Sequence, residues 1–169
     1  MEIFNTDNYE NIIIKFNKKC GAGHFCDFEY IIELSCYENF PYLEIYPKDN
    51  LHKNIDEISF TKNMEIDYEY FVDIFQKLKI IDYNVFKISN EWYDTSYIIF
   101  EISINNYYFK VKYFPCDVFD KYYNKHLENK IFNENELLNI EMLNNVYDDL
   151  MNKIDGVNWH KNIQKNYIK

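Results

Sequence analysis

The segment 97–114 constrains the fold most, because its turn chemistry and its side-chain pattern predict the same β-hairpin. Asn105-Asn106 can form a two-residue turn, since asparagine tolerates a positive φ. The register of that turn makes every pair on one face apolar, with Ile104 opposite Tyr107, Ile102 opposite Phe109, Phe100 opposite Val111 and Ile98 opposite Tyr113. On the other face Glu101 lies opposite Lys110, which is a complementary charge pair. The sequence therefore predicts an antiparallel hairpin with one buried face.

Three further strands are predicted before this hairpin, at 27–36, 42–46 and 55–60, with a turn around Pro41. The first of them alternates cleanly. Its apolar positions are Phe28, Tyr30, Ile32, Leu34 and Cys36, and its polar positions include Asp27, Glu29, Glu33 and Ser35. We therefore expect a half-buried strand with an acidic outer face.

Helical spacing predicts five helices. The first spans 7–19, begins at a capping Asp7 and stops at Gly21. Its expected inner face consists of Tyr9, Ile12, Ile13, Phe16 and Cys20. The other helices are expected at 67–79, at 117–129, at 133–154 with Gly156 as its stop, and around Trp159 to Tyr167.

These elements predict an α+β fold with a mostly antiparallel sheet of about five or six strands packed against helices, two of them at the C-terminus. The connections between strands are short, which favours antiparallel pairing. No linker rich in Gly, Ser or Pro divides the chain, which holds 3 Gly and 3 Pro in 169 residues. We therefore expect residues 1–169 to form a single acidic domain, with a lysine-bearing C-terminal segment at 152–169.

The charge of the chain indicates which classes of partner it can bind. The formal net charge is −10, and residues 26–70 alone hold eleven acids against three lysines. A groove that wraps nucleic acid needs clustered positive charge, so direct nucleic-acid binding is disfavoured. Arginine is absent, which removes bidentate recognition of phosphate. The aromatic content of 20% accompanies an excess of residues with AT-rich codons, so by itself it does not indicate a binding surface.

The sequence predicts a cytoplasmic protein of bacterial or phage origin. No apolar run reaches the roughly 20 residues of a membrane span. Met1 to Tyr9 contains Glu2 and Asp7 in place of the basic and apolar regions of a secretory signal. Without such a signal, four cysteines are expected to stay reduced.

One cluster offers metal-ligand residue types, namely Cys20, His24 and Cys26, with Cys36 further along the chain. Two thiols and an imidazole on a glycine turn can hold zinc, but the spacing is not that of a standard zinc knuckle. Cys20 and Cys36 also fit the apolar faces of their predicted elements. As a nucleophile, Cys26 could use His24, and Cys116 precedes a predicted helix start. Neither carries a catalytic signature, so we expect no cofactor and no enzyme activity.

The sequence thus favours an acidic protein-binding inhibitor that occludes the basic nucleic-acid site of a partner enzyme. In type, though in no motif, the chain resembles bacterial immunity proteins against nuclease toxins and phage anti-CRISPR proteins, which are small, acidic and motif-poor. The expected contact residues are Asp27, Glu29, Glu33, Glu38, Glu44, Asp56 and Glu57, with Trp92 and Tyr93 as anchors. Two alternatives remain open, a small cysteine-dependent or metal-binding enzyme and an adaptor that self-associates through the Tyr107 to Phe114 edge.

Overall fold

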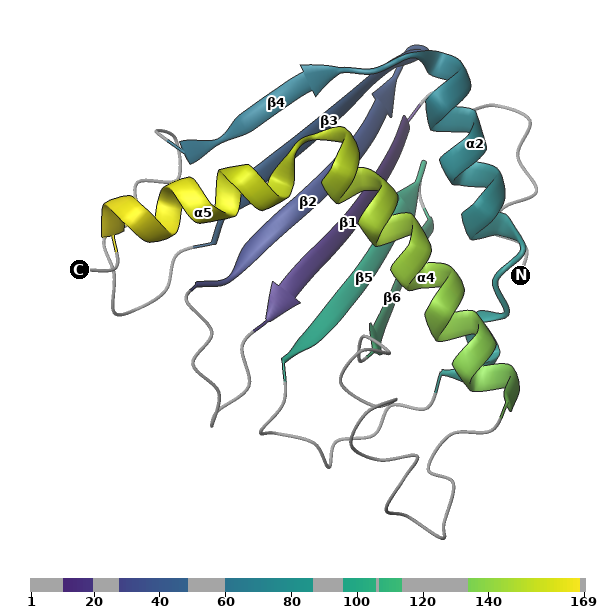
Figure 1. The fold of residues 1–169 in the computed structure, drawn as a ribbon. Helices are drawn as coiled ribbons and strands as arrows, with labels where there is room; N and C mark the ends of the chain where they lie inside the picture. The colour runs from purple at the N-terminus through teal and green to yellow at the C-terminus, as the bar shows by residue number, and fades with distance from the viewer. Residues whose placement is uncertain are drawn as a thin grey trace, which may run out of the picture.

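Six antiparallel strands form one sheet, and the first of them in the chain lies in its interior. The computed structural model describes residues 11–19, 28–48, 60–86, 96–105, 107–113 and 134–167. The strands are β1 (Asn11–Lys19), β2 (Tyr30–Tyr37), β3 (Phe40–Pro47), β4 (Lys62–Glu65), β5 (Tyr97–Ile104) and β6 (Tyr107–Tyr113). Their order across the sheet is β4-β3-β2-β1-β5-β6, and every neighbouring pair is antiparallel (Figure 1).

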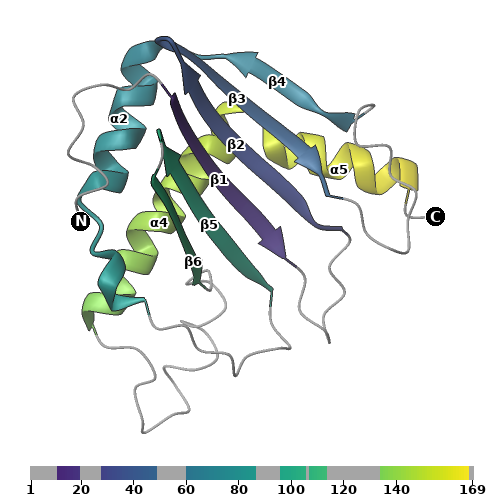
Figure 2. The ribbon, with the colours of Figure 1, turned by 180° about the vertical axis from the view of Figure 1, so that it is seen from behind.

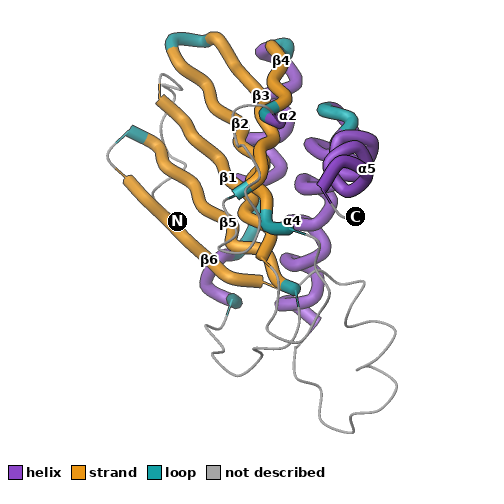
Figure 3. Tube along the Cα trace, turned by 90° about the vertical axis from the view of Figure 1, so that its left-hand side faces the viewer, coloured by secondary structure: helices purple, strands orange, loops and turns teal. Residues whose placement is uncertain are grey.

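The described helices lie on one side of this sheet. They are α2 (Tyr68–Lys79), α4 (Glu134–Lys153) and α5 (Gly156–Tyr167), and a short 3-10 turn, η2 (Tyr83–Val85), follows α2. Figure 2 shows the sheet from the side opposite α4 and α5, and Figure 3 shows strands and helices as two layers. The predicted α+β fold, with its antiparallel sheet and two C-terminal helices, is confirmed. None of these helices combines the length and the apolar character needed to cross a lipid bilayer.

The hairpin predicted at 97–114 is confirmed, including its register. Ile104 pairs with Tyr107 and Glu101 pairs with Lys110, and the other three apolar pairs form as expected. Asn105 has a φ of 52°, which is the left-handed conformation that the turn requires. Ile98, Phe100, Ile102 and Ile104 are all buried against the helices.

The helix predicted at 7–19 is wrong, because residues 11–19 form strand β1. Ile12, Ile14 and Phe16 alternate with period two and are fully buried, whereas Ile13, assigned to the inner face of the helix, is exposed on the other side of the strand. Three consecutive β-branched isoleucines favour an extended backbone. The pairing of β1 with both β2 and β5 stabilises that conformation.

The strands predicted at 27–36 and 42–46 are confirmed as β2 and β3, although β3 begins earlier. Their turn is formed by Glu38 and Asn39, while Pro41 lies within β3. Pro41 is tolerated there, and its carbonyl accepts a hydrogen bond from Ile66 N at 3.2 Å. Strand β4 was not predicted, since its four residues are too few for a recognisable alternation. The strand predicted at 55–60 lies almost wholly outside the described residues.

The helices predicted at 67–79, at 133–154 and near the C-terminus are confirmed as α2, α4 and α5. The prediction that Gly156 ends the helix at 133–154 is wrong, because α4 ends at Lys153. Asp155 adopts the left-handed conformation with a φ of 56°, and Gly156 is the first residue of α5. A Cβ at this position would lie 2.6 Å from Met151 Sδ, so a larger residue would require the Met151 side chain to shift. The helix predicted at 117–129 lies outside the described residues.

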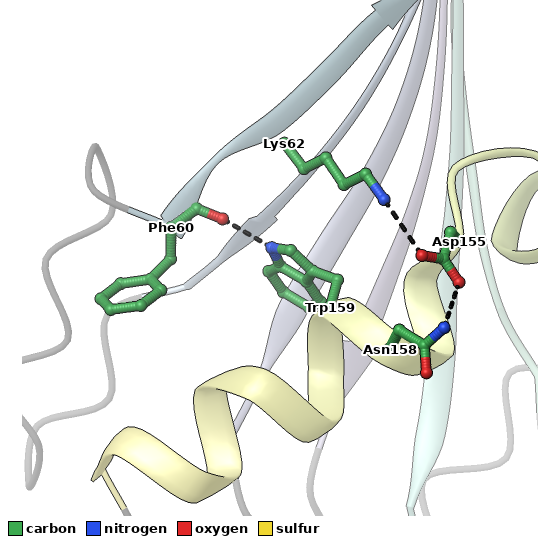
Figure 4. A network of polar contacts seen from close by, with 5 residues as sticks. All are labelled: Phe60, Lys62, Asp155, Asn158 and Trp159. Atoms are coloured by element: carbon green, nitrogen blue, oxygen red, sulfur yellow. Dashed lines mark hydrogen bonds and ion pairs between the residues drawn. The ribbon is translucent and has the colours of Figure 1, made fainter.

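Helix α5 is joined to the edge strand by a small polar network (Figure 4). Trp159 Nε1 donates a hydrogen bond to the carbonyl oxygen of Phe60 at 2.5 Å, next to the start of β4. Lys62 Nζ lies 3.5 Å from Asp155 Oδ2, and Asp155 also accepts from Asn158 at 2.8 Å. The last helix is therefore held against the edge of the sheet by side chains as well as by apolar packing.

Candidate protein-interaction surface

The side of the sheet opposite the helices, called the outer face below, carries the odd-numbered side chains of β1, β2 and β5 and their cross-strand partners. The strand register aligns one row of polar residues across all six strands. From β4 to β6 that row reads Asn63, Glu44, Glu33, Lys15, Glu101 and Lys110. The outer face is therefore charged along its middle.

Lysines from β1 and β6 neutralise much of that charge. Lys15 Nζ lies 2.8 Å from Glu33 Oε2, and Lys110 Nζ lies 3.0 Å from Glu101 Oε1. At the end of β1, Lys19 Nζ approaches Glu29 Oε2 at 2.5 Å. The hydrogen bond to Glu101 is the main reason that the pKa of Lys110 is raised. These pairs reduce the net attraction that the central strands can exert on a cation.

The structure describes four of the expected contact residues. Glu29, Glu33 and Glu44 lie on the outer face, and Glu38 lies in the β2–β3 turn. Of these, Glu29 and Glu33 are paired with lysines. The other expected contacts, Asp27, Asp56, Glu57, Trp92 and Tyr93, lie outside the described residues and remain predictions.

The β2–β3 turn, the end of β4 and the start of α2 meet at one end of the sheet (Figure 1). Several carboxylates gather there, and the stretches of sequence that hold them contain no lysine. We call this region the acidic corner. Lysine is absent from residues 31–47 and from residues 63–76. The exposed carboxylates of the corner are Glu38, Glu65, Asp67 and Glu69, and its exposed aromatic side chains are Tyr37, Phe40, Tyr42 and Tyr68.

A hydrogen bond fixes part of this corner. Tyr42 Oη donates to Glu65 Oε1 at 2.9 Å across β3 and β4. This bond to the carboxylate is the main cause of a raised pKa for Tyr42. Tyr68 stacks on Phe71 with the ring centroids 6.1 Å apart. Tyr42 and Tyr68 are therefore each held by a contact with a neighbouring side chain.

Glu65, Asp67, Glu69 and the aromatic members of the corner are not among the contact residues predicted from the sequence. The missed signal was the stretch Tyr37-Glu38-Asn39-Phe40, in which an asparagine-containing pair separates two alternating segments. A turn placed there would have put Tyr37 opposite Phe40 on the outer face. The meeting of this turn with the start of α2 depends on β4, which the sequence did not reveal.

Among the proposed metal ligands, the structure describes Cys36 alone. Its side chain is buried on the helix side of β2, and burial raises the pKa of its thiol. A protonated, buried thiol suits packing better than zinc binding. Cys20, His24 and Cys26 lie outside the described residues, as does Cys116. Within the described part of the chain, no three His, Cys, Asp or Glu side chains are grouped so that they could hold a metal ion.

A pocket of about 330 Å³ lies between the start of β4 and α5. The polar groups that line the pocket bind one another (Figure 4). Lys62 forms an ion pair with Asp155, and the indole N–H of Trp159 donates a hydrogen bond to the carbonyl of Phe60. This arrangement attaches a helix to the sheet, and the acidic corner is the better candidate for recognition.

Comparison with known proteins finds no relative, since no family model, curated protein or solved structure matches the chain.

Proposed function

We propose that this chain is an acidic protein-binding inhibitor that docks on the basic nucleic-acid site of a partner enzyme. The observation that carries this proposal is the acidic corner, where four exposed carboxylates gather in two stretches of sequence that contain no lysine. The net charge of −10 means that the whole molecule, like the acidic corner, is negatively charged. A protein with this charge is attracted to a basic partner and repelled by nucleic acid.

The mechanism follows from the chemistry of the target site. An enzyme that binds nucleic acid neutralises phosphates with lysine and arginine side chains. Carboxylates held by a rigid sheet can occupy those side chains and exclude the substrate. Asp27, Asp56 and Glu57, with Trp92 and Tyr93, remain the predicted extensions of the contact. In this respect the proposed role matches that of immunity proteins and anti-CRISPR proteins.

The test is affinity capture of the tagged chain from host or target-cell lysate, followed by an activity assay on the captured protein. We expect a basic nuclease or other nucleic-acid enzyme that is retained at low salt, is reduced by high salt, and is inhibited when the purified chain is added. The variant Glu65→Gln/Glu69→Gln should weaken both capture and inhibition. The matched variant Glu134→Gln/Glu141→Gln changes the same net charge on α4 and should change neither. A captured partner that is not inhibited would contradict the proposal.

Self-association is a second candidate, favoured by Tyr107 and Tyr108, which are 60% and 61% exposed on edge strand β6. Lys110 and Lys112 on the same strand oppose edge-to-edge pairing. Light scattering over a hundredfold range of concentration decides between the two. A rising mass that Tyr107→Lys abolishes would support self-association.

A further inference from the structure

We propose that the β2–β3 turn, Tyr37–Phe40, is the element that enters the partner's site, and that its two aromatic rings receive a lysine or arginine side chain of the partner protein. This inference rests on the proposed function for the class of partner. It goes further by naming the recognition element and the side chain recognised.

The first support is the exposure of an aromatic pair. Tyr37 and Phe40 lie directly opposite each other at the end of β2 and β3, and they are 63% and 73% exposed. Tyr42, next on the same face of β3, is 39% exposed. Large exposed rings at the tip of a hairpin remain in contact with water unless a partner covers them. Tyrosine and phenylalanine are enriched at protein interfaces, and tyrosine is also enriched among their hot spots.

The second support is the chemistry around these rings, which selects a basic side chain. Glu38 lies in the turn between the rings, and Glu65 accepts a hydrogen bond from Tyr42, the next exposed ring on the same face of β3. A cation above an aromatic face gains about 0.5–2 kcal/mol, and a neighbouring carboxylate accepts its N–H groups. An acidic peptide or a phosphate would be repelled by the same carboxylates.

The backbone of the turn agrees with this assignment. Glu38 and Asn39 have φ values of 49° and 68°, as in the two-residue turns that favour asparagine and glycine. Asparagine fits this conformation, whereas glutamate at the first position costs about 1 kcal/mol. A negatively charged residue therefore occupies a turn position that asparagine or glycine would fit better.

The central carboxylates contribute less to recognition of a cation. Glu29 and Glu33 already form ion pairs with Lys19 and Lys15, and a partner's cation would have to displace those lysines. Among the residues that the structure describes, no lysine forms an ion pair with Glu38 or Glu65, so a cation at the turn would displace none of them. Affinity should therefore depend more on Tyr37 and Phe40 than on the strand carboxylates.

The experiment uses a ten-residue arginine peptide as the probe and the full chain labelled with ¹⁵N. At 150 mM salt we expect the largest amide shift changes at residues 37–42 and 65–69. The variant Tyr37→Ser/Phe40→Ser should weaken binding at least tenfold. The matched variant Tyr107→Ser/Tyr108→Ser, which removes two equally exposed tyrosines from β6, should leave the affinity within twofold. The variant Glu38→Asn suits the turn better, so it should fold at least as stably and still bind more weakly.

Unchanged affinity in Tyr37→Ser/Phe40→Ser, or shift changes centred on the row of Lys15 and Glu33, would overturn the inference. The inhibition assay separates this failure from that of the proposed function. If Tyr37→Ser/Phe40→Ser still inhibits the captured enzyme fully, the inference fails and the inhibitor role stands. If the peptide binds at the turn but the captured partner is not a nucleic-acid enzyme, the inference stands and the inhibitor role fails.

Discussion

Glu33 of β2 lies directly opposite Glu44 of β3, so two carboxylates are cross-strand neighbours on the outer face. Tyr46 Oη donates a hydrogen bond to Glu33 at 2.9 Å, and Lys15 pairs with the same carboxylate. Within the part of the chain that the structure describes, no lysine forms an ion pair with Glu44. Like charges in this relationship destabilise a sheet.

Replacing Glu44 should therefore stabilise the domain. We expect Glu44→Gln to raise the free energy of unfolding by about 0.2–1 kcal/mol, because it removes the repulsion between two opposed carboxylates. Urea unfolding at pH 7 measures the change. The control is Glu101→Gln, which breaks the ion pair with Lys110 and should lower stability by a similar amount. The same sign of change in both variants would contradict this account.

Stability should fall as the pH rises above 10. Burial is the main cause of raised pKa values for Tyr30, Tyr83 and Tyr147, and it raises the pKa of Tyr70 to about 12. Each hydroxyl therefore holds its proton longer in the folded chain than in the unfolded chain, where tyrosine titrates near 10. The stabilisation is complete below pH 10 and is lost above it, because the unfolded state then binds fewer protons.

The measurement is urea unfolding at intervals from pH 8 to pH 12 in wild type and in Tyr70→Phe. The variant loses the hydrogen bond from Tyr70 Oη to the carbonyl of Asp149, which spans 3.3 Å, so it should be less stable by up to about 1 kcal/mol at pH 8. Its stability should then fall less steeply between pH 10 and pH 12. Equal slopes in the two proteins would count against the assigned shift.

Asn139 of α4 should be a stability determinant although it is polar. It is buried, its Oδ1 accepts from the backbone N of Asp82 at 2.8 Å, and its Nδ2 donates to the carbonyl of Asn135. Asn139→Ala would remove the acceptor of a part-buried backbone N–H and a buried amide that is hydrogen-bonded within the helix, so we expect a loss of about 1–3 kcal/mol in urea unfolding. Asn145→Ala, at an exposed position of the same helix, should change stability by less than about 0.5 kcal/mol.

Trp159 should control the attachment of α5 to the sheet. In Trp159→Phe the carbonyl of Phe60 loses its indole donor (Figure 4), and we expect a loss of about 1–3 kcal/mol. Hydrogen exchange should also be accelerated more in β4 than in β5, because β4 follows Phe60 directly in the chain. Val157→Ala, which changes an exposed residue of α5, serves as the control. Equal acceleration in both strands would indicate general destabilisation instead.

Local signals predicted the hairpin, β2 and three helices because each element is specified by neighbouring residues. In β5 and β6 the turn, the apolar pairs and the pair Glu101–Lys110 all require one register. The segment of β1 was misread because Ile12 and Phe16 fit both a period of 3.6 and a period of two. Its pairing with two distant strands decided between these patterns, and a single segment does not contain that information.

The candidate surface was predictable in part. Alternation in β2 placed Glu29 and Glu33 on the outer face, and the structure confirms that position. Their pairing with Lys19 and Lys15 depends on the position of β1, which was predicted as a helix. The acidic corner combines the β2–β3 turn with the start of α2 through the contact of Ile66 with Pro41. Such a meeting of segments is a property of the tertiary fold.

The interior position of β1 has a consequence for synthesis of the chain. Its two neighbours emerge from the ribosome at very different times, because β5 begins about 80 residues after β1 ends, whereas β2 follows soon after. At roughly 5–20 residues per second, one edge of β1 waits on the order of ten seconds for its partner. During that interval the nascent chain exposes an isoleucine-rich, unpaired strand edge, and a cell that makes this protein must keep that edge from pairing with other chains.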